Sequence, residues 1–238
     1  MFTIVIPTKN EEHYLQILLE TIKKQTLLPV EIIVADAGSM DATREIAATF
    51  GAKVVEGGLP GAGRNRGAAE VKTPYILFLD ADVRLDDPTM LERAFKEMTE
   101  RGLDLATCDV APSNDSRLDR ALHKAYNSYV RFVSPIMPHA PGFCIFVKKS
   151  LHDAIGGFDE TVTFCEDHDY AHRAAHAGRF GFLSMAVPVS TRRLDRDGRA
   201  SVAIKYALAE LHIAVIGPIR HKLFNYTFGH SSKKTSSV

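Results

Sequence analysis

The feature that decides the fold is an apolar run that ends in acidic residues, Tyr75-Ile76-Leu77-Phe78-Leu79-Asp80-Ala81-Asp82. An apolar run of this length, bounded by polar residues, is typical of a strand that is buried on both faces of a sheet. Similar short runs occur at residues 3–7, 30–35, 53–55, 103–107, 144–147 and 180–183. The sequence therefore predicts a central sheet with several buried strands.

Helices are predicted between these strands from the residues that begin and end them. Asp41 is a favourable N-cap for residues 42–50, and Gly51 ends that segment. Further helices are expected over residues 88–101, 150–155 and 166–177, each followed by a glycine. The alternation of strands and helices is typical of an α/β domain with a mostly parallel sheet and right-handed crossovers.

The composition is that of a globular protein. Of the 238 residues, 45% are hydrophobic and 24% are charged, which excludes disordered and collagen-like chains. Basic and acidic residues are balanced at 29 each, so we expect no nucleic-acid partner. The three cysteines, Cys108, Cys144 and Cys165, form no Cys-x-x-Cys pair, and we expect buried thiols in a cytoplasmic protein.

The C-terminal segment is basic and partly apolar. After position 189, nine Lys and Arg residues stand against three acidic residues. Such a segment can lie on an anionic membrane surface, which would make the protein peripheral to the membrane. The alternative is a helix packed on the domain and followed by a solvated tail. The apolar residues 213–219 are far fewer than the ~20 that a spanning helix requires, so no transmembrane helix is expected.

Polar clusters follow three of the predicted strands, at residues 7–12, 36–39 and 80–82. The carboxyl ends of parallel strands meet at one edge of a sheet, where ligands bind. Asp80 and Asp82 offer the hard oxygen ligands that Mg²⁺ or Mn²⁺ prefers, with coordination positions left for a diphosphate. Turn or helix-cap chemistry is the alternative for this pair. Asp36 and Asn10, at the other two strand ends, favour a shared ligand site.

The glycine-rich stretch at residues 57–67 contains Arg64 and Asn65. Its Gly-x-Gly-x-x-x-Gly spacing does not match the dinucleotide-binding pattern. We expect a flexible loop in which Arg64 clamps a base or a diphosphate through its planar guanidinium. The alternative is a glycine-rich turn with a solvated arginine.

Glu166 and Asp167 stand at the start of a predicted helix. The positive end of the helix dipole favours an ionised carboxylate there, and such a carboxylate is a candidate general base for a hydroxyl. Simple capping is the alternative. His168, His172 and His176 recur every four residues on the same helix, and we expect a solvated or interface face there, with a transition-metal site as the alternative.

Four segments together resemble the family 2 glycosyltransferases: residues 6–12, 33–43, 79–82 and 156–167, with Arg173 further along. The similarity covers residues 2–193. It implies a GT-A (Rossmann-like) fold with a mixed, mostly parallel central sheet flanked by helices. It also implies transfer of a sugar, with inversion, from a nucleotide-diphospho-sugar to an acceptor hydroxyl on a glycan or a lipid-linked (polyprenyl-phosphate) molecule.

The resemblance assigns a role to each matching position. Asp82 would ligate the divalent cation, Mn²⁺ or Mg²⁺, and Asp167 would be the catalytic base. Ala37 departs from the family, which often has a second aspartate there, so base recognition stays open. The nucleotide-sugar would contact Pro7, Thr8, Asn10, Glu11, Asp36, Arg64, Asp80 and Ala81.

The second half of the chain is predicted to shape the acceptor site. Gly142, Phe143 and Glu166 are candidate acceptor-side residues, and Phe143 can offer its ring to a sugar, with core packing as the alternative. The predicted units are a glycosyltransferase domain at 1–200, divided into a nucleotide-binding half (1–82) and an acceptor half (83–200), and a C-terminal helix and tail at 201–238.

Two other functions compete with this interpretation. A sugar-phosphate nucleotidyltransferase would place a glycine-rich phosphate loop after the first strand, where this chain has Pro7-Thr8-Lys9-Asn10-Glu11. The second competitor is a non-catalytic module that binds a nucleotide-sugar or associates with a membrane. The acidic residues Asp82 and Asp167 argue against it.

Overall fold

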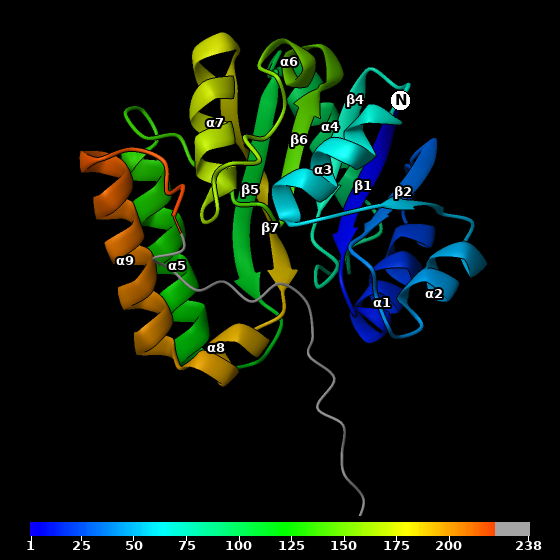
Figure 1. The fold of residues 1–238 in the computed structure, drawn as a ribbon, viewed down its shortest axis with the longest axis horizontal. Helices are drawn as coiled ribbons and strands as arrows, with labels where there is room; N and C mark the ends of the chain where they lie inside the picture. Colours follow the sequence, from blue (N-terminus) through cyan, green and yellow to red (C-terminus); the bar gives the residue numbers. More distant parts are fainter. Residues whose placement is uncertain (222–238) are drawn as a thin grey trace, which may run out of the picture.

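The computed structural model describes residues 1–221. Its strands form one sheet in the order β3-β2-β1-β4-β6-β5-β7 (Figure 1). Neighbouring strands are parallel except that β6 runs antiparallel to both β4 and β5. The predicted mixed, mostly parallel sheet is confirmed. The strands are β1 (Phe2–Thr8), β2 (Glu31–Asp36), β3 (Lys53–Glu56), β4 (Tyr75–Leu79), β5 (Leu105–Pro112), β6 (Cys144–Lys148) and β7 (Phe180–Val189).

Helices flank the sheet on both faces (Figure 1). The four predicted helices are confirmed to within a few residues as α2, α4, α6 and α7. Helices α1, α5 and α8 are not predicted by the sequence pattern. The helices are α1 (Glu12–Lys23), α2 (Thr43–Thr49), α3 (Pro60–Ala69), α4 (Met90–Glu100), α5 (Arg117–Val133), α6 (Lys149–Ala154), α7 (Glu166–Ala177), α8 (Arg192–Asp197) and α9 (Arg199–Val215).

The prediction of a flexible glycine-rich loop is wrong, because most of that stretch forms α3. Pro60 stands at the helix start, where its missing N–H costs nothing. A Cβ atom at Gly67 would overlap the Val5 side chain, so glycine lets α3 lie directly against β1. The glycines of this segment therefore serve close packing of a helix on a strand.

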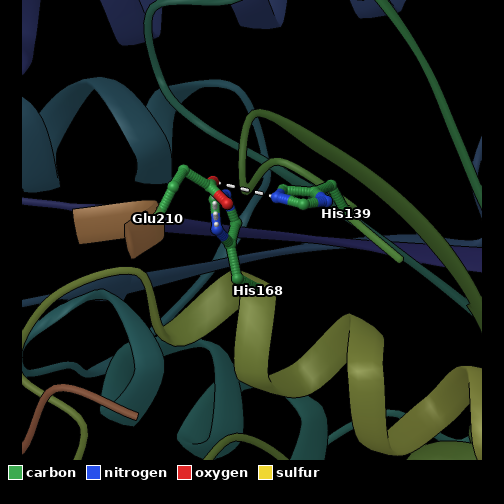
Figure 2. Close-up of side chains that lie close together, drawn as sticks. All are labelled: His139, His168 and Glu210. Atoms are coloured by element: carbon green, nitrogen blue, oxygen red, sulfur yellow. Dashed lines mark hydrogen bonds and ion pairs between the residues drawn. The ribbon is translucent and has the colours of Figure 1, made fainter. Parts of the chain in front are cut away.

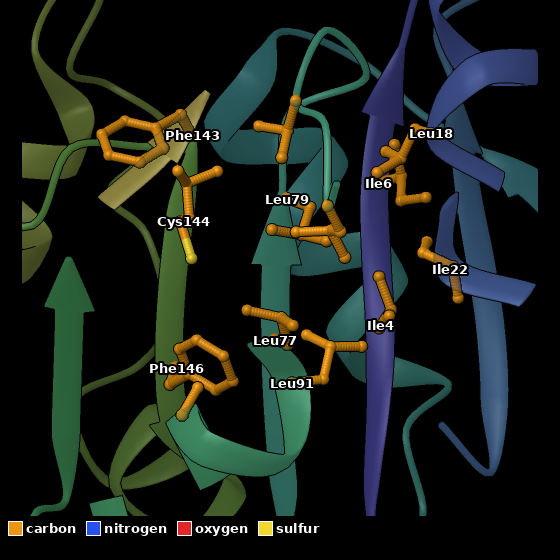
Figure 3. Packing of buried hydrophobic residues seen from close by; sticks show 14 of the residues in the cluster. Ile4, Ile6, Leu18, Ile22, Leu77, Leu79, Leu91, Phe143, Cys144 and Phe146 are labelled. Atoms are coloured by element: carbon orange, nitrogen blue, oxygen red, sulfur yellow. The ribbon is translucent and has the colours of Figure 1, made fainter. Parts of the chain in front are cut away.

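Successive residues of the buried strands point to opposite faces of the sheet, and each face has its own core. On one face, Ile4 and Ile6 of β1 pack with α1, α2 and α4 (Figure 3). On the other face, Val5 packs with α3, α6 and α7. Truncation of a fully buried residue such as Leu77 to alanine costs about 2–5 kcal/mol in comparable cores. The core thus fixes the strands from which the polar loops emerge.

The parallel strands β1, β2 and β4 end at the same edge of the sheet. Thr8 at the end of β1 is in register with Asp36 at the end of β2. On the other side of β1, Val5 is in register with Phe78 of β4, so the turn that follows Leu79 lies at the same edge. This edge is the one that sequence reasoning predicts for the ligand.

Helices α5 and α9 stand side by side at the margin of the domain (Figure 1). Arg199 at the start of α9 donates to both carboxylate oxygens of the buried Asp119 on α5, at 2.6 and 2.7 Å. Ala209 of α9 packs with Phe164 in a small separate core. Among residues 1–221, no helix is both long enough and apolar enough to cross a bilayer. The predicted tail beyond residue 221 lies outside the described residues.

Candidate active site

The loop that follows β1 is bonded to the loop that follows β2. Asn10 has a φ of 53°, a left-handed conformation that asparagine tolerates better than most residues. Its Oδ1 accepts the Met40 N–H at 2.8 Å, and its own N–H donates to Ser39 Oγ at 2.8 Å. The N–H of Glu11 donates to Thr43 Oγ1 at 2.8 Å. These bonds fix two predicted nucleotide contacts, Asn10 and Glu11, at the edge of the sheet.

Asp36 organises the end of β2 from a buried position. Its Oδ1 accepts the hydroxyls of Thr8 at 3.3 Å and Ser39 at 2.5 Å. Its Oδ2 accepts the N–H groups of Gly38 at 3.1 Å and Ser39 at 3.0 Å. Pro7 and Thr8 are buried beside it. Asp36 therefore holds the loop together, and its contact with a base or ribose stays a prediction.

Arg64 is the buried centre of the site. Its side chain is only 3% exposed, and it donates to Asp80 Oδ1 at 2.8 Å and to Glu166 Oε1 at 2.9 Å. It also donates to the carbonyl oxygen of Gly142 at 3.2 Å. Burial alone would lower the pKa of Arg64, but the carboxylates of Asp80 and Glu166 raise it above its ordinary value. The guanidinium therefore stays charged and joins three segments of chain; its contact with a donor molecule stays a prediction.

Gly142 is required by this arrangement. A Cβ atom at position 142 would overlap the guanidinium of Arg64, so a larger residue would push Arg64 away from its carboxylates. Phe143 beside it lies in the main core, as the alternative interpretation of that residue expects. Of the two, Gly142 is therefore the residue that bears directly on the site.

Asp82 pairs with a residue that sequence reasoning missed. Its Oδ2 lies 3.2 Å from Nη2 of Arg192, which begins α8 directly after β7. Burial raises the pKa of Asp82 to about 6; Arg192 opposes this shift, whereas Asp80 and Glu11 add to it. The sequence shows that basic residues follow the last strand, but nothing in it predicts that Arg192 contacts Asp82 after β4. Ala81 is buried between the two aspartates.

The acidic turn after β4 fits a divalent cation. Asp80 and Asp82 supply carboxylate oxygens, the ligand type that Mg²⁺ and Mn²⁺ take, and Asp80 is about one third exposed at the edge of the site. A buried carboxylate whose charged form is disfavoured by two acidic neighbours is also stabilised by a nearby cation. The donor set is therefore compatible with the predicted metal.

Asp167 and Glu166 begin α7 and face different partners. Asp167 Oδ2 accepts the N–H of Gly142 at 2.7 Å, and its Oδ1 accepts the N–H of His168 at 3.0 Å. Burial, and then repulsion from Asp167, raises the pKa of Glu166, although Arg64 opposes this shift. Burial therefore acts against the helix dipole at Glu166, whereas the ion pair with Arg64 acts with it.

Five of the predicted residues belong to one connected network. Asp80 and Glu166 bind the same guanidinium, and Gly142 contacts Arg64 through its carbonyl and Asp167 through its N–H. Asp82 lies two residues from Asp80 in the turn after β4. Asp80, after β4, and Glu166, of α7, therefore meet at Arg64, although 86 residues separate them in the chain.

The three histidines of α7 do not share one environment. His172 and His176 are exposed, with ring centroids 4.4 Å apart. His168 is buried instead, and its ring lies 4.3 Å from that of His139, beside Glu210 of α9 (Figure 2). The expectation of one solvated or interface face is therefore wrong for His168, because α9 and the loop before β6 cover it.

Comparison with known proteins identifies the family. The model of "Glycosyl transferase family 2" matches residues 3–156, which is more than half of the chain. The chain belongs to this family. The succinoglycan biosynthesis protein ExoA of Rhizobium meliloti is 28% identical over an alignment of 192 residues that covers 74% of this chain and 58% of that protein. The minor teichoic acid biosynthesis protein GgaA of Bacillus subtilis is 24% identical, over 70% of this chain and 41% of that protein.

Solved structures of glycosyltransferases share the fold of this family 2 member. The mannosyltransferase PcManGT of Pyrobaculum calidifontis, in complex with GDP-Man and Mn²⁺, has a TM-score of 0.69 at 19% identity, covering 88% of this chain and 61% of that chain. TarS residues 1–349 of S. aureus, in complex with UDP-GlcNAc, has a TM-score of 0.65 at 21% identity, covering 79% and 58%. The expected GT-A fold is confirmed. This chain spans less than two thirds of both of these proteins.

Proposed function

We propose that this family 2 glycosyltransferase moves a sugar from a nucleotide-diphospho-sugar to an acceptor hydroxyl with inversion at the anomeric carbon. One observation supports the proposal: Arg64 bonds both to Asp80, after β4, and to Glu166, which precedes Asp167 at the start of α7. The nucleotide would lie over the ends of β1, β2 and β4, where ligands bind in sheets of this type.

Asp167 is the residue that we assign as the general base. Its carboxylate is held by the Gly142 N–H and is 19% exposed, so an acceptor hydroxyl can reach the remaining lone pairs. It would take the proton of the hydroxyl as that oxygen attacks the anomeric carbon and the bond to the diphosphate breaks. Attack from the side opposite the leaving group gives inversion in a single displacement.

Asp82 and Asp80 are the residues that would hold Mn²⁺ or Mg²⁺. When bound, the cation supplies positive charge against the departing nucleoside diphosphate. Structures of glycosyltransferases with the same fold contain Mn²⁺ together with GDP-Man or UDP, which supports this assignment. Arg192, already beside Asp82, would add a guanidinium that can meet phosphate oxygens.

The experiment that tests the proposal is a panel of nucleotide-diphospho-sugars incubated with the protein, Mn²⁺ and simple glycoside or lipid-phosphate acceptors. We expect one donor to release its nucleoside diphosphate and to give a product of inverted configuration, read by the anomeric coupling in NMR. Release of pyrophosphate from a sugar phosphate and a nucleoside triphosphate would instead support a nucleotidyltransferase. Donor binding without release of the diphosphate would support a non-catalytic module.

For the acceptor, we propose a lipid-linked molecule at a membrane surface. Exposed apolar side chains are concentrated on α5, α9 and the turns after them, although α9 also has apolar residues on its packed side. Exposed apolar side chains gathered on neighbouring helices are typical of an interaction surface. The exposed residues are Leu118, Leu122, Tyr129, Phe132, Ile136, Ile204, Leu208, Leu211, Val215 and Ile216.

Basic residues accompany this apolar surface. Arg117, Arg120 and Lys124 of α5 suit anionic lipid headgroups, which attract such side chains by about 1 kcal/mol each. We expect salt-sensitive sedimentation with anionic vesicles and little with neutral ones, and a large loss in a Phe132→Asp, Leu211→Asp variant. Met40→Asp, an exposed apolar position far from these helices in the chain, is the matched control. A dimer that the double variant dissociates, without vesicle binding, would contradict the membrane assignment.

A further inference from the structure

A second cluster of metal-ligating side chains lies beside Asp167, outside the acidic turn. His139 precedes β6, His168 is on α7, and Glu210 is on α9 (Figure 2). One ligand atom from each of these residues lies within 4.8 Å of the others. His139 and His168 are buried, and Glu210 is largely so. The cluster thus joins three segments that are far apart in the chain, at the place where α9 meets the domain.

The hydrogen bonds of His139 define which of its nitrogens carries a proton. Nδ1 lies 2.5 Å from the carbonyl oxygen of Met137, which can only accept, so Nδ1 is the N–H. A neutral imidazole then has a lone pair on Nε2, and Nε2 faces Oε1 of Glu210 at 2.9 Å. Two atoms that both accept cannot approach so closely without a positive charge between them.

His168 and Glu210 also have polar atoms that lack a hydrogen-bond partner. Nδ1 of His168 lies 3.2 Å from the same Oε1 of Glu210, yet it makes no hydrogen bond of acceptable geometry. Oε2 of Glu210 is buried and has no hydrogen-bond partner. A buried polar atom without a partner destabilises the fold, so a native structure normally supplies a group that satisfies it.

We propose that His139 Nε2, His168 Nδ1 and a Glu210 oxygen bind a zinc ion. Two imidazoles and one carboxylate are a ligand set typical of Zn²⁺, which leaves a fourth tetrahedral position for water or another ligand. The contact from His139 Nδ1 to a backbone carbonyl is the outer bond that commonly orients a zinc-bound histidine. Glu210 Oε1 lies 2.9 Å from His139 Nε2 and 3.2 Å from His168 Nδ1, near the spacing that tetrahedral bonds of about 2.0–2.1 Å produce.

The zinc would fasten α9 to α7 next to the proposed base. His168 follows Asp167 directly, and its Nε2 lies 3.9 Å from Asp167 Oδ1. This site differs in chemistry from the acidic turn, because Mg²⁺ and Mn²⁺ prefer oxygen ligands whereas nitrogen ligands favour zinc. The inference therefore does not depend on the proposed glycosyl transfer.

The experiment measures metal content and not turnover. Protein purified without chelator or added metal is expected to contain about one zinc ion per chain, and the metal-stripped protein to bind about one Co²⁺ with visible absorption bands. Glu210→Gln and His139→Gln should each lose most of this metal. His172→Gln, on the exposed part of α7, and Asp82→Ala, in the acidic turn, should retain it.

The competing explanation is that a proton, not a metal, supplies the positive charge. In that case the wild-type protein would contain zinc well below one ion per chain, and Co²⁺ titrations of wild type and Glu210→Gln would coincide. Either result would overturn the proposal. Circular dichroism of each variant separates loss of metal from loss of fold, and if His139→Gln does not fold, the comparison of Glu210→Gln with His172→Gln decides.

Discussion

Arg192 and Glu11 form an ion pair with two hydrogen bonds between segments that are far apart in the chain. Nη1 of Arg192 donates to Oε2 of Glu11 and Nη2 donates to Oε1, both at 2.7 Å, and 181 residues separate the two in the chain. Glu11 lies three residues after the end of β1, directly before α1, whereas Arg192 begins α8 after β7, the last strand in the sheet order. The pair therefore brings the start of α8 to the edge of the sheet where β1, β2 and β4 end, and Arg192 lies beside Asp82.

The first prediction concerns the stability that this pair provides. Arg192→Met leaves Glu11 buried without its partner, and we expect the free energy of unfolding to fall by about 2–3 kcal/mol, less than for a fully buried pair because Arg192 is partly exposed. The double variant with Glu11→Gln should be less destabilised than the sum of the two single variants. Urea unfolding measures the cycle, and strict additivity would show that the pair is not coupled.

The second prediction concerns the metal dependence. Asp82→Ala removes the most buried carboxylate of the acidic turn, so we expect turnover to lose its stimulation by Mn²⁺. Asp86→Ala is the control, because Asp86 lies four residues further along, is exposed and pairs with Arg84 at 2.9 Å. Turnover is measured across a Mn²⁺ titration for both variants. If Asp82→Ala responds to Mn²⁺ as the wild type does, Asp82 does not bind the metal and has only a structural role in the turn after β4.

The third prediction separates chemistry from binding. Asp167→Asn keeps an oxygen that can accept the Gly142 N–H but removes the base, so turnover should fall by about 10²–10⁴-fold. Affinity for the nucleoside diphosphate should stay near the wild-type value, as measured by calorimetry. Asp169→Asn, two residues along the same helix and paired with Arg173 at 2.8 Å, is the matched control and should retain most turnover. Normal turnover in Asp167→Asn would show that Asp167 is not the general base.

The fourth prediction concerns acid stability and His152. Burial lowers the pKa of His152 to about 4, and Nδ1 of its ring lies 3.0 Å from the Tyr170 hydroxyl, which can donate to it. An unfolded chain binds this proton at a pKa of about 6.5, so acid favours unfolding. The stabilising contribution is complete above about pH 6.5 and is lost as the pH falls towards 4, by up to about 3 kcal/mol.

Urea unfolding at a series of pH values measures this loss. In His152→Gln the free energy of unfolding should depend less steeply on pH between about 6.5 and 4 than in the wild type. His176→Gln, an exposed histidine, should retain the wild-type slope. If the free energy of unfolding depends equally on pH in wild type and His152→Gln, the histidine has the same pKa in the folded and unfolded states.

Much of the fold was determined by local sequence. Buried strands such as β1 and β4 are short apolar runs, and the glycines after the predicted helices end them, because both signals depend on neighbouring residues alone. The acidic turn at Asp80 and Asp82 and the start of α7 at Glu166 were also located in this way. The parallel order of β1, β2 and β4 then placed their polar ends at one edge.

Only the tertiary structure decided which side chains meet. Glycines at 57–67 suggest a loop, yet close packing on Val5 makes the segment a helix and buries Arg64 among carboxylates. Arg192 reaches Asp82, and Glu210 reaches His168, across distances in the chain that no periodic pattern encodes. The physical reason is that such ion pairs follow from the packing of whole helices and strands, whereas residue spacing reports the state of a single element.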